Sequence, residues 1–132
     1  MAEALFNCSA AGHHAWSVGT DVDLPGETLL AYRERVGAKR SYVIPVMSAR
    51  GYDVTAAVRT PLTVDLLGGR WDLVISMAEF WAAPLYLRDD PRYVYWHVPD
   101  PGGKSFRATA DAEEVIAEMV DVLLGQLRRS VG

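Results

Sequence analysis

Cysteine is almost absent from this chain of 132 residues, in which Cys8 is the only one. A single cysteine excludes an internal disulfide and a zinc site built from several thiolates. Disulfides are typical of secreted proteins, so this composition favours a reducing, cytoplasmic location. The segment from Met1 to Asn7 contains Glu3 and lacks a basic start, so we expect no secretion signal there.

Long apolar runs and an excess of positive charge are also lacking. No apolar stretch approaches the roughly 20 residues that span a bilayer, so we expect no membrane partner. With 13 Lys and Arg residues against 17 Asp and Glu, the formal net charge is −4. Nucleic-acid binding requires clustered positive charge, and the basic residues within 33–40 are more typical of a solvated helix face. We therefore expect no nucleic-acid partner.

Half of the residues are apolar, which is enough to build one hydrophobic core in a chain of this length. No repeat, low-complexity tract or linker divides the sequence, so we predict a single domain over residues 1–132. The apolar run at 71–77 lacks clean alternation, as in a parallel strand that is covered on both faces. A second strand is predicted at 93–98, before the Pro- and Gly-rich segment 99–103.

Most other predicted elements are helices. The C-terminal helix has apolar residues at helical spacing from Ile116 to Leu127, and Asp111 with Glu114 predicts a capping-box start. The remaining predictions are helices at 1–11, 27–36, 39–51 and 78–87, a short helix beginning at Thr60–Pro61, and a strand at 15–20. Strands that alternate with helices predict an α/β fold with a parallel sheet.

Several segments match a known pattern in order along almost the whole chain. Residues 1–7 (MAEALFN) are similar to the helix in the motif C-x5-R-S-x-M-A-E-A, and residues 17–20 (SVGT) to the motif S-A-G-T. Residues 72–77 (DLVISM) and 96–101 (WHVPDP) are similar to the strand D-x-V-I-x-M and the loop W-x-x-P-D-P. Together they resemble the low-molecular-weight phosphatase superfamily, which includes protein tyrosine phosphatases and thiol-coupled arsenate reductases. The resemblance implies a three-layer α/β/α sandwich with a short parallel sheet.

The same resemblance implies candidate site residues. Asp100 matches the aspartate that, in the family, protonates the leaving oxygen as a general acid. Ser17 and Trp96 lie in the matching motifs and are our candidate substrate-binding residues. No cofactor is implied. We also expect no metal site, because no carboxylate accompanies the histidines at recognised ligand spacing; these are His13, His14 and His97.

The departures from the family pattern concern the nucleophile. In the family, a cysteine and an arginine lie in a loop that binds phosphate at a helix N-terminus, and this sequence has no counterpart of that loop or of the strand before it. Cys8 and His14 imitate the C-x5-R spacing, but the first motif places Cys8 at the far end of its helix. We therefore expect a structural role for Cys8. The aromatic residues of tyrosine phosphatases are replaced by Gly102–Gly103, and the segment after Met77 lacks the relay cysteines of arsenate reductases.

Three functions are open on the sequence. The favoured one is a catalytically degenerate homologue that binds a small molecule, an oxyanion or a protein partner. The second is an active cysteine-dependent phosphatase or arsenate reductase whose sequence here starts at an internal methionine. The third is an unrelated small α/β enzyme or binding module. A missing inner strand would leave backbone groups unpaired, so we expect either a rearranged sheet or a homodimer that fills the edge.

Overall fold

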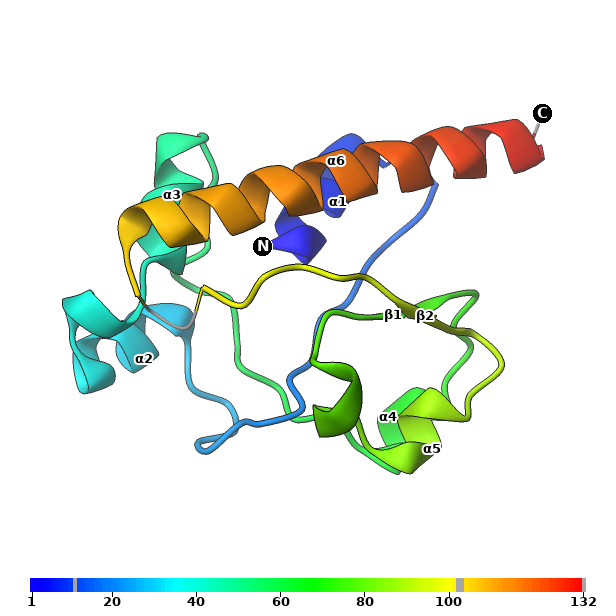
Figure 1. The fold of residues 1–132 in the computed structure, drawn as a ribbon, viewed down its shortest axis with the longest axis horizontal. Coiled ribbons are helices and arrows are strands. Elements are labelled where there is room, and N and C mark those ends of the chain that lie inside the picture. The colour runs from blue at the N-terminus through cyan, green and yellow to red at the C-terminus, as the bar shows by residue number, and fades with distance from the viewer. Residues whose placement is uncertain (11, 102–103, 132) are drawn as a thin grey trace.

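The structure is a computed structural model that describes residues 1–10, 12–101 and 104–131. Its longest element is the C-terminal helix α6 (Phe106–Val131) (Figure 1). The Ser105 hydroxyl accepts a hydrogen bond from the Ala108 amide at 3.0 Å, which satisfies a free amide at the helix start. The predicted helix is confirmed, but its predicted start at Asp111 is wrong because Ser105 provides the cap. Asp111 instead pairs with Arg107 on the exposed helix surface.

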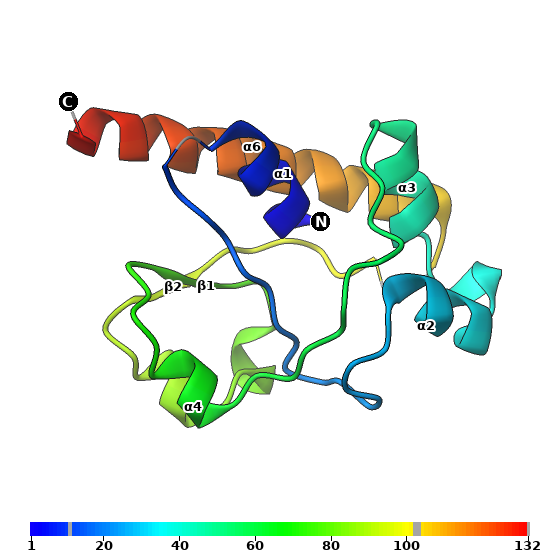
Figure 2. The same ribbon diagram turned by 180° about the vertical axis from the view of Figure 1, so that it is seen from behind.

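Helices α1 (Ala2–Ser9) and α3 (Val43–Ala49) pack across α6 (Figure 2). Their shared cluster is the main core of the described residues, and it contains Leu5, Phe6, Met47, Val98, Ala112, Ile116, Val120 and Leu124. Pro45 lies in the first turn of α3, as predicted, where its missing amide costs no helical hydrogen bond. The predicted helix 39–51 is shorter than expected, because Ala38–Arg40 forms a separate 3-10 turn.

Two short strands, β1 (Val74–Ser76) and β2 (Tyr93–Tyr95), form a parallel pair. Val74 is opposite Tyr93, and Ser76 is opposite Tyr95. Both strands lie within the predicted ranges, and their parallel orientation is confirmed. The described part of the chain is therefore a mixed α/β fold with a two-stranded sheet.

The strand predicted at 15–20 is wrong. In this segment only Gly19 forms a bridge to another part of the chain. Its amide donates to the Thr60 carbonyl at 2.8 Å, and its carbonyl accepts from the Leu62 amide at 2.8 Å. The side chains of Trp16, Ser17 and Val18 are exposed. No strand face of this segment is buried, so a sheet position is not stabilised.

A second, smaller core lies on the other side of the strand pair from α6 (Figures 1 and 2). It joins α4 (Val64–Leu67) and α5 (Leu85–Arg88), whose buried leucines pack with Val74 and Tyr93 of the sheet. Helices thus cover both sides of the strand pair. Pro84 divides the predicted helix 78–87 into a 3-10 turn, Phe80–Ala82, and α5.

The helix predicted to begin at Thr60–Pro61 begins later. The Thr63 hydroxyl accepts from the Leu66 amide at 3.0 Å, so Thr63 caps α4. Thr60 and Pro61 are instead paired with Gly19. A similar cap starts α2 (Leu29–Val36), where the Thr28 hydroxyl accepts from Ala31 at 3.1 Å. None of the helices in the described ranges combines the length and apolar character that crossing a membrane requires.

Arg92 fixes the turn that leads into β2. Its guanidinium donates to both Asp90 carboxylate oxygens, at 2.9 and 2.8 Å, and to the carbonyls of Leu67 at 2.6 Å and Gly69 at 2.9 Å. The carbonyl of Leu67 ends α4, so one side chain joins the end of that helix to the start of β2. The hydrogen bonds from the Arg92 side chain and backbone lower the pKa of Asp90 to about 2.

This arrangement predicts an acid-sensitive contribution to stability. Asp90 ionises near pH 2 in the folded chain and near its ordinary value of 3.8 in the unfolded chain, so the unfolded state binds more protons between these values. The contribution is therefore present above about pH 4 and is lost as the pH falls toward 2. Arg92→Met should lower the melting temperature by several degrees at pH 6 and reduce the acid-dependent loss, as measured by circular dichroism.

Arg107→Met is the matched control, because Arg107 makes one exposed ion pair within a single helix. Such pairs contribute little to stability, so the melting temperature should barely change. Equal effects of the two substitutions at every pH would contradict a joining role for Arg92.

Candidate functional site

The carboxyl ends of β1 and β2 form the candidate site, since loops at this edge of a parallel sheet commonly hold ligands. The Trp96 amide donates to the Ser76 carbonyl at 2.9 Å, which continues the pairing beyond β2. The two strands therefore deliver residues 77–79 and 96–100 to the same edge. This edge contains two of the three predicted site residues, Trp96 and Asp100.

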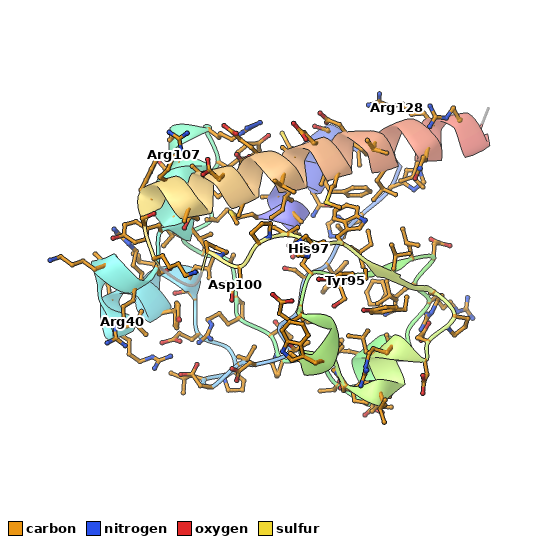
Figure 3. The ribbon with its side chains drawn as sticks, viewed as in Figure 1. Arg40, Tyr95, His97, Asp100, Arg107 and Arg128 are labelled. Atoms are coloured by element: carbon orange, nitrogen blue, oxygen red, sulfur yellow. The ribbon has the colours of Figure 1, made fainter. Side chains whose placement is uncertain are left out.

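Asp100 lies on the connection from β2 to α6, and its side chain is exposed (Figure 3). His97 lies on the same connection, closer to β2 (Figure 3). An exposed carboxylate at this edge can accept hydrogen bonds from a bound ligand, or donate a proton when it is protonated. The position is thus compatible with the acid role that the resemblance implies.

Trp96 has a large structural role. Its ring is half-buried and packs against the main core, and the next residue on the same face, Val98, is fully part of that core. Side chains alternate along an extended chain, so Tyr95 and His97 face the opposite way. Trp96 therefore supports the site from the core side.

Tyr95 and His97 form a polar pair that the sequence analysis missed. The Tyr95 hydroxyl is 3.2 Å from His97 Nδ1, and the two rings are tilted with their centroids 6.3 Å apart. A hydroxyl that donates to Nδ1 leaves Nε2–H as an outward donor on the neutral ring. The spacing i, i+2 in a predicted strand was the signal available for this pair.

Ser17 is held to α1 and not to the strand edge. Its hydroxyl donates to the Glu3 carboxylate in the first turn of α1. Asn7 secures the same segment, because its side-chain amide donates to the Ala15 carbonyl at 3.0 Å and its oxygen accepts from the Ala15 amide at 2.7 Å. These bonds explain why the segment follows α1 instead of pairing as a strand.

Two carboxylates flank the start of α1. The N-terminal amino group of Met1 interacts electrostatically with the carboxylates of Glu3 and Glu113. Glu113 is 2% exposed and lies 2.9 Å from Arg50 Nε, although its Oε1 atom is not aligned to accept a hydrogen bond. Burial raises the pKa of Glu113, and Arg50 opposes this effect. The positive end of the helix dipole favours carboxylates at this end of α1, and Glu3 lies in the first turn there.

Cys8 lies at the opposite end of α1 and is exposed. The Tyr52 side chain is hydrogen-bonded to Cys8, and this contact, together with burial, raises the pKa of Tyr52. Cys8 lies away from the helix N-terminus, which is the end that binds anions. His14 stacks edge-on against Trp16, with 5.8 Å between the ring centroids. Among the described residues, no hydrogen bond, ion pair or ring contact joins Cys8 to His14 or pairs Cys8 with a base.

Two surface hollows lie away from the strand edge. One, of about 280 Å³, follows α3 and is lined by Ile44, Ser48 and the segment 51–55. The other, of about 440 Å³, lies between α1 and the end of α6 and is lined by Ser9, Ala10, Gly12, His13, Leu124, Leu127 and Arg128. Neither hollow includes a predicted site residue. Within the described ranges, no three side chains of His, Cys, Asp or Glu gather closely enough to hold a metal ion.

Comparisons with protein-family models, with curated proteins and with solved structures found no match to this chain.

The buried Glu113 gives a testable pH dependence. Its raised pKa means that the folded chain binds more protons than the unfolded chain above the ordinary value of 4.5. The free energy of unfolding therefore falls as the pH rises from 4.5 through the raised pKa of Glu113, in the opposite direction to the Asp90 effect. Glu113→Gln should remove this fall in urea unfolding measured from pH 4 to 7. Glu114→Gln, at the exposed neighbouring position, is the control and should retain most of it.

Proposed function

We propose that this chain is a low-molecular-weight-phosphatase-like α/β/α protein that acts by binding a ligand and not by transferring phosphate. Helices on both sides of a parallel strand pair support the three-layer sandwich that the motifs imply. The proposed binding site is the carboxyl edge of β1 and β2, with Asp100 and His97 as its polar side chains and Trp96 behind them.

The observation that carries the non-catalytic part is the position of Cys8. It lies at the negative end of α1 beside Tyr52, while Asp100 lies on the β2–α6 connection. A general acid accelerates phosphate transfer only where a nucleophile attacks the same phosphorus. In the described part of the chain, no helix start carries both a cysteine and an arginine.

The proposed ligand is a small molecule that bears an aromatic group and a phosphate. His97 Nε2–H supplies a donor for a phosphate oxygen, and the Tyr95 ring, on the same face beside His97, supplies an aromatic surface. The Asp100 carboxylate at the same edge opposes the negative charge of the phosphate, which weakens binding in the native chain. A protein that presents such a group on a side chain would use the same contacts.

The first experiment separates binding from catalysis. We expect neither the purified chain nor a Cys8→Ser variant to hydrolyse p-nitrophenyl phosphate, as followed by release of p-nitrophenol. Turnover that disappears in Cys8→Ser would contradict the proposal and would make Cys8 with His14 a rebuilt nucleophile loop. Turnover that is equal in both proteins would contradict it as well.

The second experiment locates the ligand. In a titration with phenyl phosphate followed by amide chemical shifts, Asp100→Asn should tighten binding about threefold to tenfold, because it removes one negative charge. His97→Asn should weaken binding by a similar factor. Asp121→Asn removes an exposed carboxylate of α6 and should leave the affinity unchanged. Equal effects of Asp100→Asn and Asp121→Asn would show that the site lies elsewhere.

A further inference from the structure

The surface hollow between the end of α1 and the last turns of α6 has a volume of about 440 Å³. We call it the α1–α6 hollow. Sites for small molecules are commonly hollows of roughly 300–1,000 Å³, so this one is large enough to hold a ligand. None of the residues that line it belongs to the carboxyl edge of β1 and β2, so it is a separate place on the molecule.

The base of the α1–α6 hollow is apolar. Leu124 of α6 is 5% exposed and belongs to the main core, and Leu127 is half-buried and packs against that core. Residues three apart lie on the same side of a helix, so the two leucines form one surface. Ala10, directly after α1, packs against the same core and also lines the hollow. An aliphatic group that enters the hollow is removed from water by these side chains, which favours binding.

The polar side chains of the hollow suit an anion. Arg128 lines it, near the C-terminal end of α6 (Figure 3), and its side chain is exposed. None of the ion pairs among the described residues includes Arg128. His13 and Ser9 line the hollow from the side of α1 and supply a ring N–H and a hydroxyl as further donors. Among the described residues that line the hollow, no side chain is a carboxylate.

We propose that the α1–α6 hollow binds a small amphipathic carboxylate, which is an aliphatic chain with a carboxylate at one end. The chain lies on Leu124, Leu127 and Ala10, and the carboxylate accepts hydrogen bonds from Arg128. A guanidinium matches a carboxylate because it donates two parallel hydrogen bonds to the two oxygens. A cationic head group is repelled by the same guanidinium. This binding is independent of the ligand proposed for the strand edge.

A titration of the intact chain with octanoate, followed by amide chemical shifts, tests the site. We expect saturable shifts at Ser9, Ala10, Leu124 and Arg128. Hexanoate should bind about tenfold more weakly, because it buries two fewer methylene groups. Octylammonium has the same chain as octanoate but a positive head group, and it should also bind at least about tenfold more weakly. Absence of saturable shifts at these residues, or equal affinities for octanoate and octylammonium, would overturn the proposal.

A pair of neighbouring arginines tests the contact with the carboxylate. Arg128 and Arg129 both lie in the last turn of α6, but only Arg128 lines the hollow. Arg128→Gln should weaken octanoate binding about fivefold to tenfold, because it removes a charge-assisted hydrogen bond. Arg129→Gln removes the same charge from the same turn and should change the affinity less than about twofold. Equal effects of the two substitutions would mean that the general field of the helix end attracts octanoate, and would contradict binding in the hollow.

Two further variants separate this site from the strand edge. Ser9→Trp places a large ring in the hollow, so it should abolish octanoate binding and leave the affinity for phenyl phosphate unchanged. His97→Asn should leave the affinity for octanoate unchanged. If His97→Asn abolishes octanoate binding, octanoate binds at the strand edge and the proposal is wrong. If circular dichroism shows that Ser9→Trp does not fold, the comparison of Arg128→Gln with Arg129→Gln decides.

Discussion

Burial of one apolar face of α6 is the constraint on which the rest of the structure depends. Ile116, Val120 and Leu124 of this face are 3–5% exposed, and each such side chain contributes about 1.5–3 kcal/mol when it is fully buried. The face is covered by α1, by α3 and by Val98, which follows β2. Because α6 holds both α1 and the end of the β2 connection, it sets where Cys8, Ser17 and Asp100 lie.

That constraint also determines the chemistry available. With α1 packed on α6, Glu113 is buried beside the start of α1, and Cys8 is left exposed at the C-terminal end of the same helix. Asp100, His97 and Tyr95 lie instead on the segment that leaves the parallel strands. Acid and thiol are thus placed by different elements, and this arrangement supports the proposed binding role.

Polar side chains join the elements that the apolar clusters leave unconnected. Arg92 links the end of α4 to the entry of β2. Asp23 and Glu27 hold Arg35 and Arg59, at 2.7–3.0 Å, and Arg59 stacks 4.1 Å above the Tyr32 ring. This network ties α2 to the segment 57–62, and both pairings of that segment, Thr28 with Val58 and Gly19 with Pro61, lie beside it. Side chains therefore hold α2, the segment 57–62 and the entry of β2 in place in addition to backbone pairing.

The sequence by itself determined the elements whose signal is local. Helical spacing from Ile116 to Leu127 predicted α6, and the non-alternating run at 71–77 predicted a parallel β1, because both patterns reflect which faces are buried. The tertiary structure alone decided that residues 15–20 follow α1, since Asn7 and Glu3 bind that segment from another element. It also decided that Glu113 is buried and that Tyr95 meets His97. Such contacts depend on the packing of whole elements, which residue spacing along the chain does not encode.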